Sequence, residues 1–193
     1  MHTRSLAREA TKEIHKYVET LPIMSDIIKG TVNRENYTQY LVDLQHIYRA
    51  LENHSFFDPA WNVQRCDAIQ RDLEELGSGS DSGPSCPTVS YCKYISCLTD
   101  KSRYLAHVYV RYMADLSGGR IMKKHIAARE WPVHVYEFPQ SLTKKELTEQ
   151  IVPTEAAEEF VNETQSSFLS YGAILGLERY SSSNRPSLVC LDT

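Results

Sequence analysis

Regular helical spacing of apolar residues between positions 101 and 127 constrains the fold more than any other feature of this sequence. Apolar side chains recur there every three or four residues, at Leu105, Val108, Tyr112, Met113, Leu116, Ile121 and Met122. That period places them on one side of a helix. We therefore expect a long helix over 101–127, in a chain of 193 residues that is long enough for one compact domain but not for two ordinary ones.

The segments before this block are also typical of helices. Residues 4–20 predict a helix whose apolar face is formed by Leu6, Ala10, Ile14 and Val18. Pro22 ends or kinks that helix, because proline lacks the amide proton that the helix needs. A short turn then follows, which Gly30 closes, and Asn33 is a candidate N-cap for the next helix. Asn36 rather than Glu or Gln stands three residues later, so no capping box is expected.

The rest of the chain continues the helical pattern, and no pair of segments is typical of strands. Helices are expected over about 34–51, 63–76, 88–99 and 154–178. A Gly- and Ser-rich surface loop is expected at 77–84, and an irregular connection around the Trp131-Pro132 and Phe138-Pro139 pairs. The predicted fold class is therefore all-α, with one domain over 1–180 and a flexible tail over 181–193.

Charge and cysteine content narrow the classes of function. The net charge of −4 provides no overall basic field for a nucleic acid. The five cysteines are scattered, odd in number and free of C-x-x-C pairs, which favours a reduced, intracellular protein over a disulfide framework. No apolar run approaches the roughly 20 residues of a membrane span. We expect a soluble, cytoplasmic monomer, unless a C-terminal membrane anchor lies outside this sequence.

Two adjacent glycines break the rules of the long helix. Gly118 and Gly119 lie inside the 101–127 block, where each glycine costs about 1 kcal/mol relative to alanine. One interpretation is a break between two shorter helices; the other is a kinked helix whose bare backbone touches a flat ligand. The polar residues just before the glycines favour the second, because buried polar groups need partners: His107, Tyr109, Arg111, Tyr112 and Asp115.

The segment from Leu105 to Gly119, LAHVYVRYMADLSGG, resembles the signature of the heme oxygenases. The segment from Glu9 to His15, EATKEIH, resembles the helix that carries that family's proximal histidine. Residues 29–32 and 46–52 are similar to further family segments, and all these blocks occur in the family's order from residue 6 to about 125. The resemblance implies an all-α heme oxygenase-like domain, with heme between a proximal N-terminal helix and a kinked distal helix.

The resemblance also assigns roles around the heme iron. His15 would be the axial ligand and therefore the only metal ligand, with Glu19 one turn later fixing its tautomer. Ser117, Gly118 and Gly119 would bring the distal backbone over the porphyrin. On its own, a histidine beside an apolar stripe is more often a packed or exposed residue than a ligand.

Four residues would form the family's distal polar network. Asp115 would hold a water molecule beside the reacting oxygen, and Arg111, Tyr48 and Tyr94 would complete the network. The alternative for Asp115 is an exposed helix acid or a simple ion pair with Arg111.

The heme propionates need cations or hydroxyl groups. Lys12, Tyr109 and Lys144 match positions that would serve them, with Arg8 a weaker candidate. Each basic residue alone would more often be a solvated surface charge. Where the family often has arginine, Lys144 keeps the charge but loses the bidentate geometry.

The sequence departs from the family pattern at Ala114, where glycine is usual, and at Tyr171, where an asparagine commonly joins the network. Both departures put turnover in doubt more than heme binding. The pair Cys86-Pro87 resembles a heme-regulatory dipeptide, but two residues are a weak match.

The predicted function is a heme oxygenase that uses dioxygen to open heme to biliverdin, with release of carbon monoxide and ferrous iron. No flavin or dinucleotide fingerprint occurs, so the electrons would come from a separate flavoprotein reductase or a ferredoxin. One alternative is a heme carrier or sensor with weak or no turnover. Another is a relative with the same helical architecture, such as a di-iron oxidase, although no Glu-x-x-His occurs, or a thiamin-degrading enzyme, although no cysteine has acidic partners.

Overall fold

The computed structural model is helical throughout the part that it describes, which comprises residues 3–77, 83–154 and 157–176. Within those residues it contains eight α-helices and two short 3-10 helices, and no strand. The elements in order are α1 (Thr3–Thr20), α2 (Pro22–Lys29), α3 (Arg34–Glu52), η1 (Pro59–Trp61), α4 (Cys66–Glu75), α5 (Cys86–Ser96), α6 (Lys101–Ala127), η2 (His134–Tyr136), α7 (Lys144–Ile151) and α8 (Ala157–Leu175). The predicted all-α class is confirmed.

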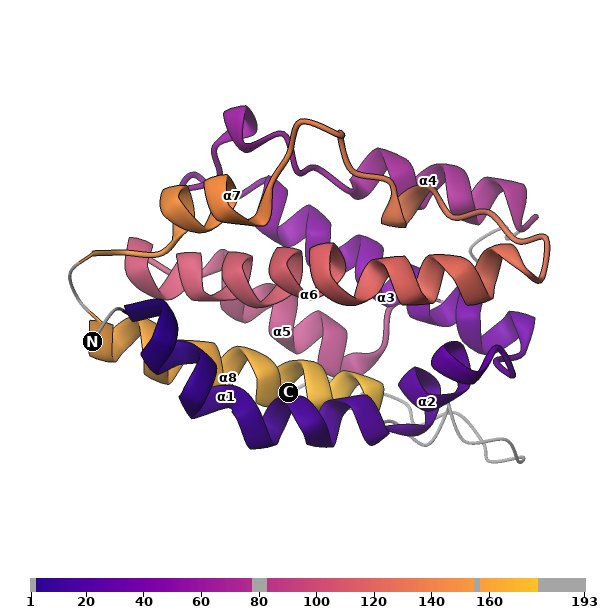
Figure 1. Ribbon diagram of the computed structural model, residues 1–193, viewed down its shortest axis with the longest axis horizontal. Helices are drawn as coiled ribbons and strands as arrows, with labels where there is room; N and C mark the ends of the chain where they lie inside the picture. The colour runs from indigo at the N-terminus through magenta and orange to yellow at the C-terminus, as the bar shows by residue number, and fades with distance from the viewer. Residues whose placement is uncertain (1–2, 78–82, 155–156, 177–193) are drawn as a thin grey trace.

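The long helices lie roughly along the long axis of the molecule. Figure 1 shows α1 and α8 side by side, α6 running across the middle, and α3 and α5 behind α6. α8 packs extensively against both α1 and α6, whereas α1 and α6 make few contacts with each other. α8 therefore forms the floor between α1 and α6, and α2 packs against α6 at one end of that space.

The N-terminal helices begin and end where the sequence predicts, with one exception. α1 ends at Thr20, and Pro22 starts a new helix at its first position, where no amide proton is needed. Residues 22–29 thus form the helix α2 instead of the predicted short turn. Gly30 ends α2 with a φ of 70°, the left-handed conformation that glycine adopts without strain. Asn33 caps α3, and its side chain accepts a hydrogen bond from the backbone of Asn36.

The long helix α6 is continuous from Lys101 to Ala127, the range that the sequence predicts. Asp100 caps its start by accepting a hydrogen bond from the backbone of Arg103. The interpretation of Gly118 and Gly119 as a break between two helices is therefore wrong. Both glycines stay helical within α6, which α8, α2 and η2 pack against, and Tyr136 of η2 lies next to Gly119.

Sequence reasoning missed the short helix α7 and placed other boundaries a few residues away. α7 begins with a capping box in which Thr143 and Glu146 exchange hydrogen bonds. α4 starts three residues later than expected, and α5 starts earlier because Ser85 caps it and Pro87 occupies its first turn. The predicted tail at 181–193 lies outside the described residues, and so does most of the predicted loop at 77–84.

Cysteine chemistry differs from expectation at one position. Cys66, Cys92 and Cys97 are free, but Cys86 is disulfide-bonded. The expectation of wholly reduced cysteines is therefore wrong for Cys86. Its sulfur is also not free for the heme-regulatory role that the weak match of Cys86-Pro87 would imply. No helix of the described residues is long and apolar enough to cross a membrane.

Candidate functional site

The start of α1 approaches α6. Burial raises the pKa of the Tyr109 hydroxyl on α6, while the guanidinium groups of Arg4 and Arg8 act in the opposite direction. These two arginines are therefore near Tyr109 of α6. Arg8 lies two helical turns before His15, so both side chains leave α1 on nearly the same side.

His15 is held in place but not buried. Its side chain is 49% exposed, and its Nδ1 lies 3.3 Å from Oε1 of Glu19, one turn later. The edge of its ring packs against Phe168 of α8, with the ring centroids 5.5 Å apart. The pairing with Glu19 that the sequence predicts is thus present, and Phe168 is a neighbour that the sequence did not identify.

A buried carboxylate is the second feature of the candidate site. Asp115 of α6 is buried, and it accepts a hydrogen bond from the hydroxyl of Tyr48 on α3. Arg111, one turn earlier, places its Nη2 3.4 Å from Oδ1 of the same carboxylate. Burial raises the pKa of Asp115, and the Arg111 charge and the Tyr48 hydrogen bond only partly oppose that effect. Three of the four predicted network residues therefore meet, and Asp115 is not an exposed helix acid.

Arg111 is the most constrained charge in the site. Its side chain is 1% exposed, and its guanidinium carbon lies 3.9 Å from the ring centroid of Tyr171 on α8. The Tyr171 hydroxyl donates to the hydroxyl of Tyr40 at 3.3 Å. Burial alone would lower the pKa of Arg111, but the neighbouring Tyr171, Tyr48 and Asp115 raise it. The Nε atom of Arg111 is buried without a hydrogen-bond partner, so the site contains an unused donor.

The two glycines differ in their surroundings. A methyl group added at Gly118 would meet no atom within 4 Å, so the backbone there borders open space. A methyl group at Gly119 would lie 3.3 Å from Cδ1 of Tyr136, so this glycine lets η2 pack directly on α6. Ser117 is exposed and Ala114 is partly buried on the same helix. Only Gly118 therefore presents the bare backbone that the sequence predicts for both positions.

The structure does not bring Tyr94 into the network of Asp115. The Tyr94 hydroxyl donates to Oε1 of Glu163 on α8 at 2.6 Å and accepts from Arg103 at 2.6 Å. Glu163 also accepts from Nε2 of the fully buried His107 at 2.9 Å. A carboxylate on a neighbouring helix thus competes for Tyr94, and a single sequence cannot reveal that contact.

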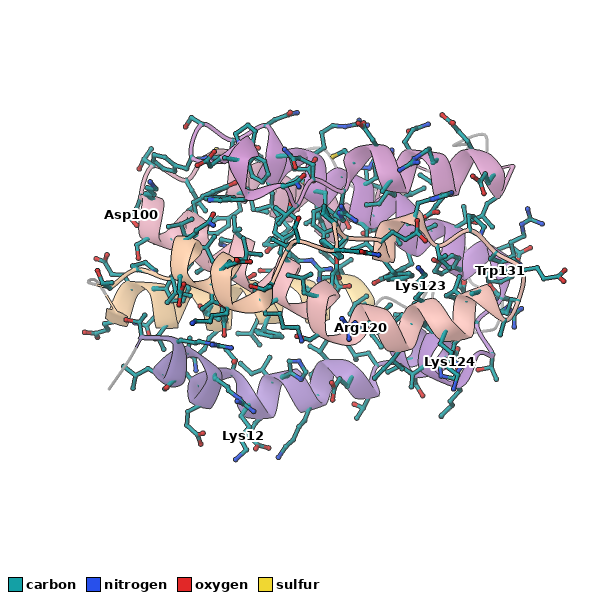
Figure 2. All side chains as sticks on the ribbon, turned by 45° about the horizontal axis from the view of Figure 1, so that its top comes forward. Lys12, Asp100, Arg120, Lys123, Lys124 and Trp131 are labelled. Atoms are coloured by element: carbon teal, nitrogen blue, oxygen red, sulfur yellow. The ribbon has the colours of Figure 1, made fainter. Side chains whose placement is uncertain are left out.

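The predicted propionate ligands lie on three separate helices. Lys12 is on an exposed side of α1, as Figure 2 shows. Tyr109 is partly buried, and its ring packs edge-on against Phe160. Lys144 is the exposed first residue of α7, which packs against α6. None of these positions is close enough to another to define a ligand by itself.

Two residues of the site, Tyr40 and Tyr136, were not predicted. Tyr40 lies on the buried stripe of α3, where nothing distinguishes it from a core aromatic residue. Tyr136 lies in the irregular connection, whose conformation depends on Asp72, since both carboxylate oxygens of Asp72 accept backbone hydrogen bonds from His134 and Val135 at 2.8 Å. The only available signal was the high content of tyrosine, 12 residues against 5 phenylalanines.

The described part of the chain also forms a hollow that is lined by other residues. It has a volume of about 460 Å³ and is lined by His46, Arg49, Ala50, Asn53, His54, Ser55, Cys92, Ser96 and Leu98. These residues belong to the C-terminal half of α3, to α5 and to the segments that follow each helix. None of them is a predicted site residue, so this hollow is not the candidate site.

An all-helical domain with an exposed imidazole on one long helix, and with bare main chain and a buried carboxylate on another, is typical of proteins that hold a flat ligand between two helices. The family model described as heme oxygenase matches residues 3–176. The chain therefore belongs to the heme oxygenase family. This finding removes the di-iron oxidase and the thiamin-degrading enzyme from consideration.

Individual relatives agree with that assignment. The chain is 34% identical to heme oxygenase 1 of Gallus gallus over 134 residues, which is 62% of this chain and 45% of the relative. It is 30% identical to heme oxygenase 2 of Macaca fascicularis over 135 residues, or 62% of this chain and 42% of the relative. The match thus spans less than half the length of these curated relatives.

Solved structures show the same fold. Heme oxygenase from Leptospira interrogans has a TM-score of 0.75 and 26% identity, over 91% of this chain and 99% of its own. Heme oxygenase-1 from the cyanobacterium Synechocystis, solved in complex with heme, has a TM-score of 0.76 and 23% identity, over 91% of each chain. The second likeness concerns the fold alone.

Proposed function

We propose that this protein binds heme between α1 and α6 and opens the ring oxidatively to biliverdin, with release of carbon monoxide and iron. The observations that carry the proposal are the exposed His15 on α1, and the open backbone at Gly118 and the buried Asp115 on α6. Membership of the heme oxygenase family supports it. Heme is bound in a family structure of the same fold.

The residues present fit a heme. An axial ligand needs one free imidazole nitrogen, and the pairing of Nδ1 with Glu19 assigns that task to Nε2 of His15. A porphyrin face needs an apolar or bare surface, which Gly118 supplies. The unpartnered Nε of Arg111 is a donor that a bound ligand or an ordered water can satisfy. Lys12, Tyr109 and Lys144 would serve the propionate carboxylates, with Arg8 nearby on α1.

The bound heme supplies both the iron that activates dioxygen and the ring that is oxidised. The residues of the protein then position the water molecule that delivers a proton to the reacting oxygen. Asp115 holds a water molecule in the open space, because its carboxylate is already fixed by Tyr48 and Arg111. Arg111 lowers the pKa of the Asp115 carboxyl against the effect of burial, and the hydrogen bond from Tyr48 orients it. Tyr94 takes no direct part, since Glu163 and Arg103 occupy its hydroxyl.

The electrons come from a separate protein, such as a flavoprotein reductase or a ferredoxin, since the sequence carries no flavin or dinucleotide motif. We expect the protein to act as a monomer.

An anaerobic titration with hemin, followed by a reductant and then air, tests the proposal. Hemin should bind stoichiometrically with a sharp Soret band, and the band should decay in air while a bilin appears. A Soret band that persists without a bilin would contradict turnover. Failure to bind hemin would contradict the whole proposal.

A heme carrier with weak turnover is the second candidate. Two residues that depart from the family pattern favour it. Ala114 adds a methyl group to the distal helix, and Tyr171 engages the Arg111 guanidinium through its ring instead of through an amide. Under this hypothesis, Ala114→Gly should create or greatly increase bilin formation. A variant that only lowers an already good rate would reject the carrier.

A further inference from the structure

A row of aromatic side chains connects the buried network to the surface. We name Tyr171, Tyr40, Tyr37 and Trp131 the aromatic chain. The Tyr171 and Tyr40 hydroxyls lie 3.3 Å apart, and the rings of Tyr40 and Tyr37 are stacked with centroids 6.2 Å apart. Tyr37 stacks on Trp131 at 5.5 Å with an interplanar angle of 21°. Each ring thus contacts the next without an intervening aliphatic residue.

The two ends of the aromatic chain differ in environment. Tyr171 lies beneath the guanidinium of Arg111 in the candidate site, one turn after Phe168, which packs on His15. The three tyrosines are almost fully buried. Trp131 is only partly buried and lies at the edge of the molecule, where Figure 2 labels it. The guanidinium of Arg129 lies 4.3 Å from the Trp131 ring and holds it against the surface.

Core packing alone does not explain why Tyr37 is a tyrosine. Its side chain is fully buried, and its hydroxyl makes no hydrogen bond of good geometry, because its polar neighbour is the Tyr136 hydroxyl, which is also buried without such a bond. A buried hydroxyl without a well-formed hydrogen bond destabilises the fold, so phenylalanine would pack at least as well there. What phenylalanine lacks is an electron-rich phenol ring, which gives up an electron far more readily than a phenyl ring.

We propose that the aromatic chain carries an oxidising equivalent from the heme site to Trp131 and so protects the site from oxidative damage. This inference rests on the proposed binding of heme. Reduction of hydrogen peroxide to two water molecules takes two electrons and two protons, and the protons come from solvent. A bound heme would supply one electron, and Trp131 would supply the other through Tyr37, Tyr40 and Tyr171. Because the positive charge of Arg129 opposes a charged indole, the indole N–H proton leaves to solvent with the electron.

A second row of rings provides an internal comparison. The ring of Tyr48 lies 5.1 Å from that of Tyr112, Tyr112 lies 6.5 Å from Phe57, and Phe57 lies 5.2 Å from Trp61. This row also leads from the site to a tryptophan, but Phe57 interrupts it with a phenyl ring. The structure therefore predicts that Trp131 is oxidised and that Trp61 is not.

The test uses the hemin-loaded protein, hydrogen peroxide and a nitroso spin trap, with the trapped residue located by mass spectrometry. The adduct should form at Trp131 in the wild type. Tyr37→Phe should remove most of that adduct. Phe57→Tyr should make Trp61 a new site of trapping, and Trp131→Phe should shift the adduct to the tyrosines.

The outcomes separate this inference from the proposed function. Protein that does not bind hemin contradicts the proposed function first. If hemin binds normally but the Trp131 adduct is unchanged in Tyr37→Phe, the aromatic chain is not the route. Equal trapping at Trp61 and Trp131 in the wild type would also overturn the inference. Circular dichroism and hemin titration of each variant confirm that the fold and the heme site are intact.

Discussion

The guanidinium carbon of Arg111 lies 3.9 Å from the centroid of the Tyr171 ring, and both side chains are buried. Nη2 of the same guanidinium group lies 3.4 Å from Oδ1 of Asp115. Tyr171 therefore fixes the charge that in turn fixes Asp115. The position of an aromatic residue on α8 thereby controls a carboxylate on α6.

Replacement of Tyr171 tests whether its ring holds the Arg111 guanidinium in place. Tyr171→Phe keeps the ring over Arg111 and loses the hydrogen bond to Tyr40, so we expect a loss of only about 1 kcal/mol in the free energy of unfolding. Tyr171→Asn removes the ring and leaves a cavity beside a buried charge, with an expected loss of about 3 kcal/mol. Urea denaturation measures both. Equal losses in the two variants would show that the ring does not hold Arg111.

Asp115→Asn should abolish bilin formation but retain the spectrum of bound hemin. The amide keeps the size of the side chain, but it cannot act as a base, and such proton-transfer groups contribute about 10²–10⁴-fold to a rate. Bilin absorbance under single-turnover conditions measures the change. A variant that forms bilin at the wild-type rate would exclude Asp115 from the chemistry.

The raised pKa of Asp115 also predicts a pH dependence of stability. A carboxyl whose pKa is higher in the folded state than in the unfolded state stabilises the fold at low pH and loses that contribution as the pH rises through the folded-state value. The wild type should therefore become less stable relative to Asp115→Asn as the pH increases from about 4. Denaturation of both proteins over this range measures the difference, and a difference that is constant with pH would contradict the assignment.

His15→Ala should change the ferric heme spectrum and leave the fold intact. The side chain is 49% exposed, so its removal costs little stability. Loss of the proposed axial imidazole should shift the Soret band and weaken hemin binding. Glu19→Gln is the matched control, because it alters the partner of Nδ1 and retains the ligand. An unchanged spectrum in His15→Ala would remove His15 from the site.

Sequence patterns predicted those parts of the fold that depend on local interactions. The bounds of α6 follow from a long apolar period and a capping aspartate, and the end of α2 follows from Gly30. α7 was missed because its eight residues carry little periodic apolar character and its position depends on packing against α6. α2 was missed because Pro22 ends one helix and begins the next at once.

In the site, too, some residues could be predicted from the sequence, and others depend on tertiary contacts. Asp115, Arg111 and Tyr48 could be predicted from the family resemblance, and the structure brings them together. Tyr40 and Tyr136 could not, because each reaches the site from a segment whose placement depends on tertiary contacts. Tyr94 was assigned to the wrong neighbours because Glu163, 69 positions later, binds its hydroxyl.

Alanine at each of the two glycines should have different effects. In Gly118→Ala the added methyl group has no neighbouring atom within 4 Å. Because alanine has a higher helix propensity than glycine, the free energy of unfolding of the ligand-free protein should rise by up to about 1 kcal/mol. The same methyl group would project into the space proposed for heme and should weaken hemin binding. Thermal denaturation measures the gain in stability, and hemin titration measures the loss of affinity. A Gly118→Ala protein that binds hemin normally would show that the heme does not lie over this residue.

Gly119→Ala places its methyl group 3.3 Å from the ring of Tyr136, so the ring must move by a few tenths of an ångström. The gain in helix propensity is then offset by overpacking, which typically costs about 1–3 kcal/mol. We expect lower stability with near-normal hemin affinity, the reverse of Gly118→Ala. The double variant Gly119→Ala with Tyr136→Leu should recover part of the loss; no recovery would mean that Tyr136 is not the obstacle.

Glu163 should make the protein sensitive to acid. Burial on its own raises the pKa of Glu163, but hydrogen bonds from His107, Tyr94 and Arg103 lower it to about 2. A carboxylate with a lowered pKa stabilises the fold above its unfolded value, near 4.5, and loses that contribution as the pH falls toward 2. The size of the shift corresponds to about 3 kcal/mol at neutral pH.

Glu163→Gln should therefore be less stable than the wild type at pH 7, and the difference should vanish near pH 2. Denaturation curves of both proteins across this range measure the difference. Tyr94→Phe removes one of the three donors and should raise the midpoint of the acid transition without abolishing it. Because Arg103 and His107 still bind the carboxylate, its effect must be smaller than that of Glu163→Gln. A stability difference that persists undiminished at pH 2 would show that the folded protein does not depend on the ionised form of Glu163.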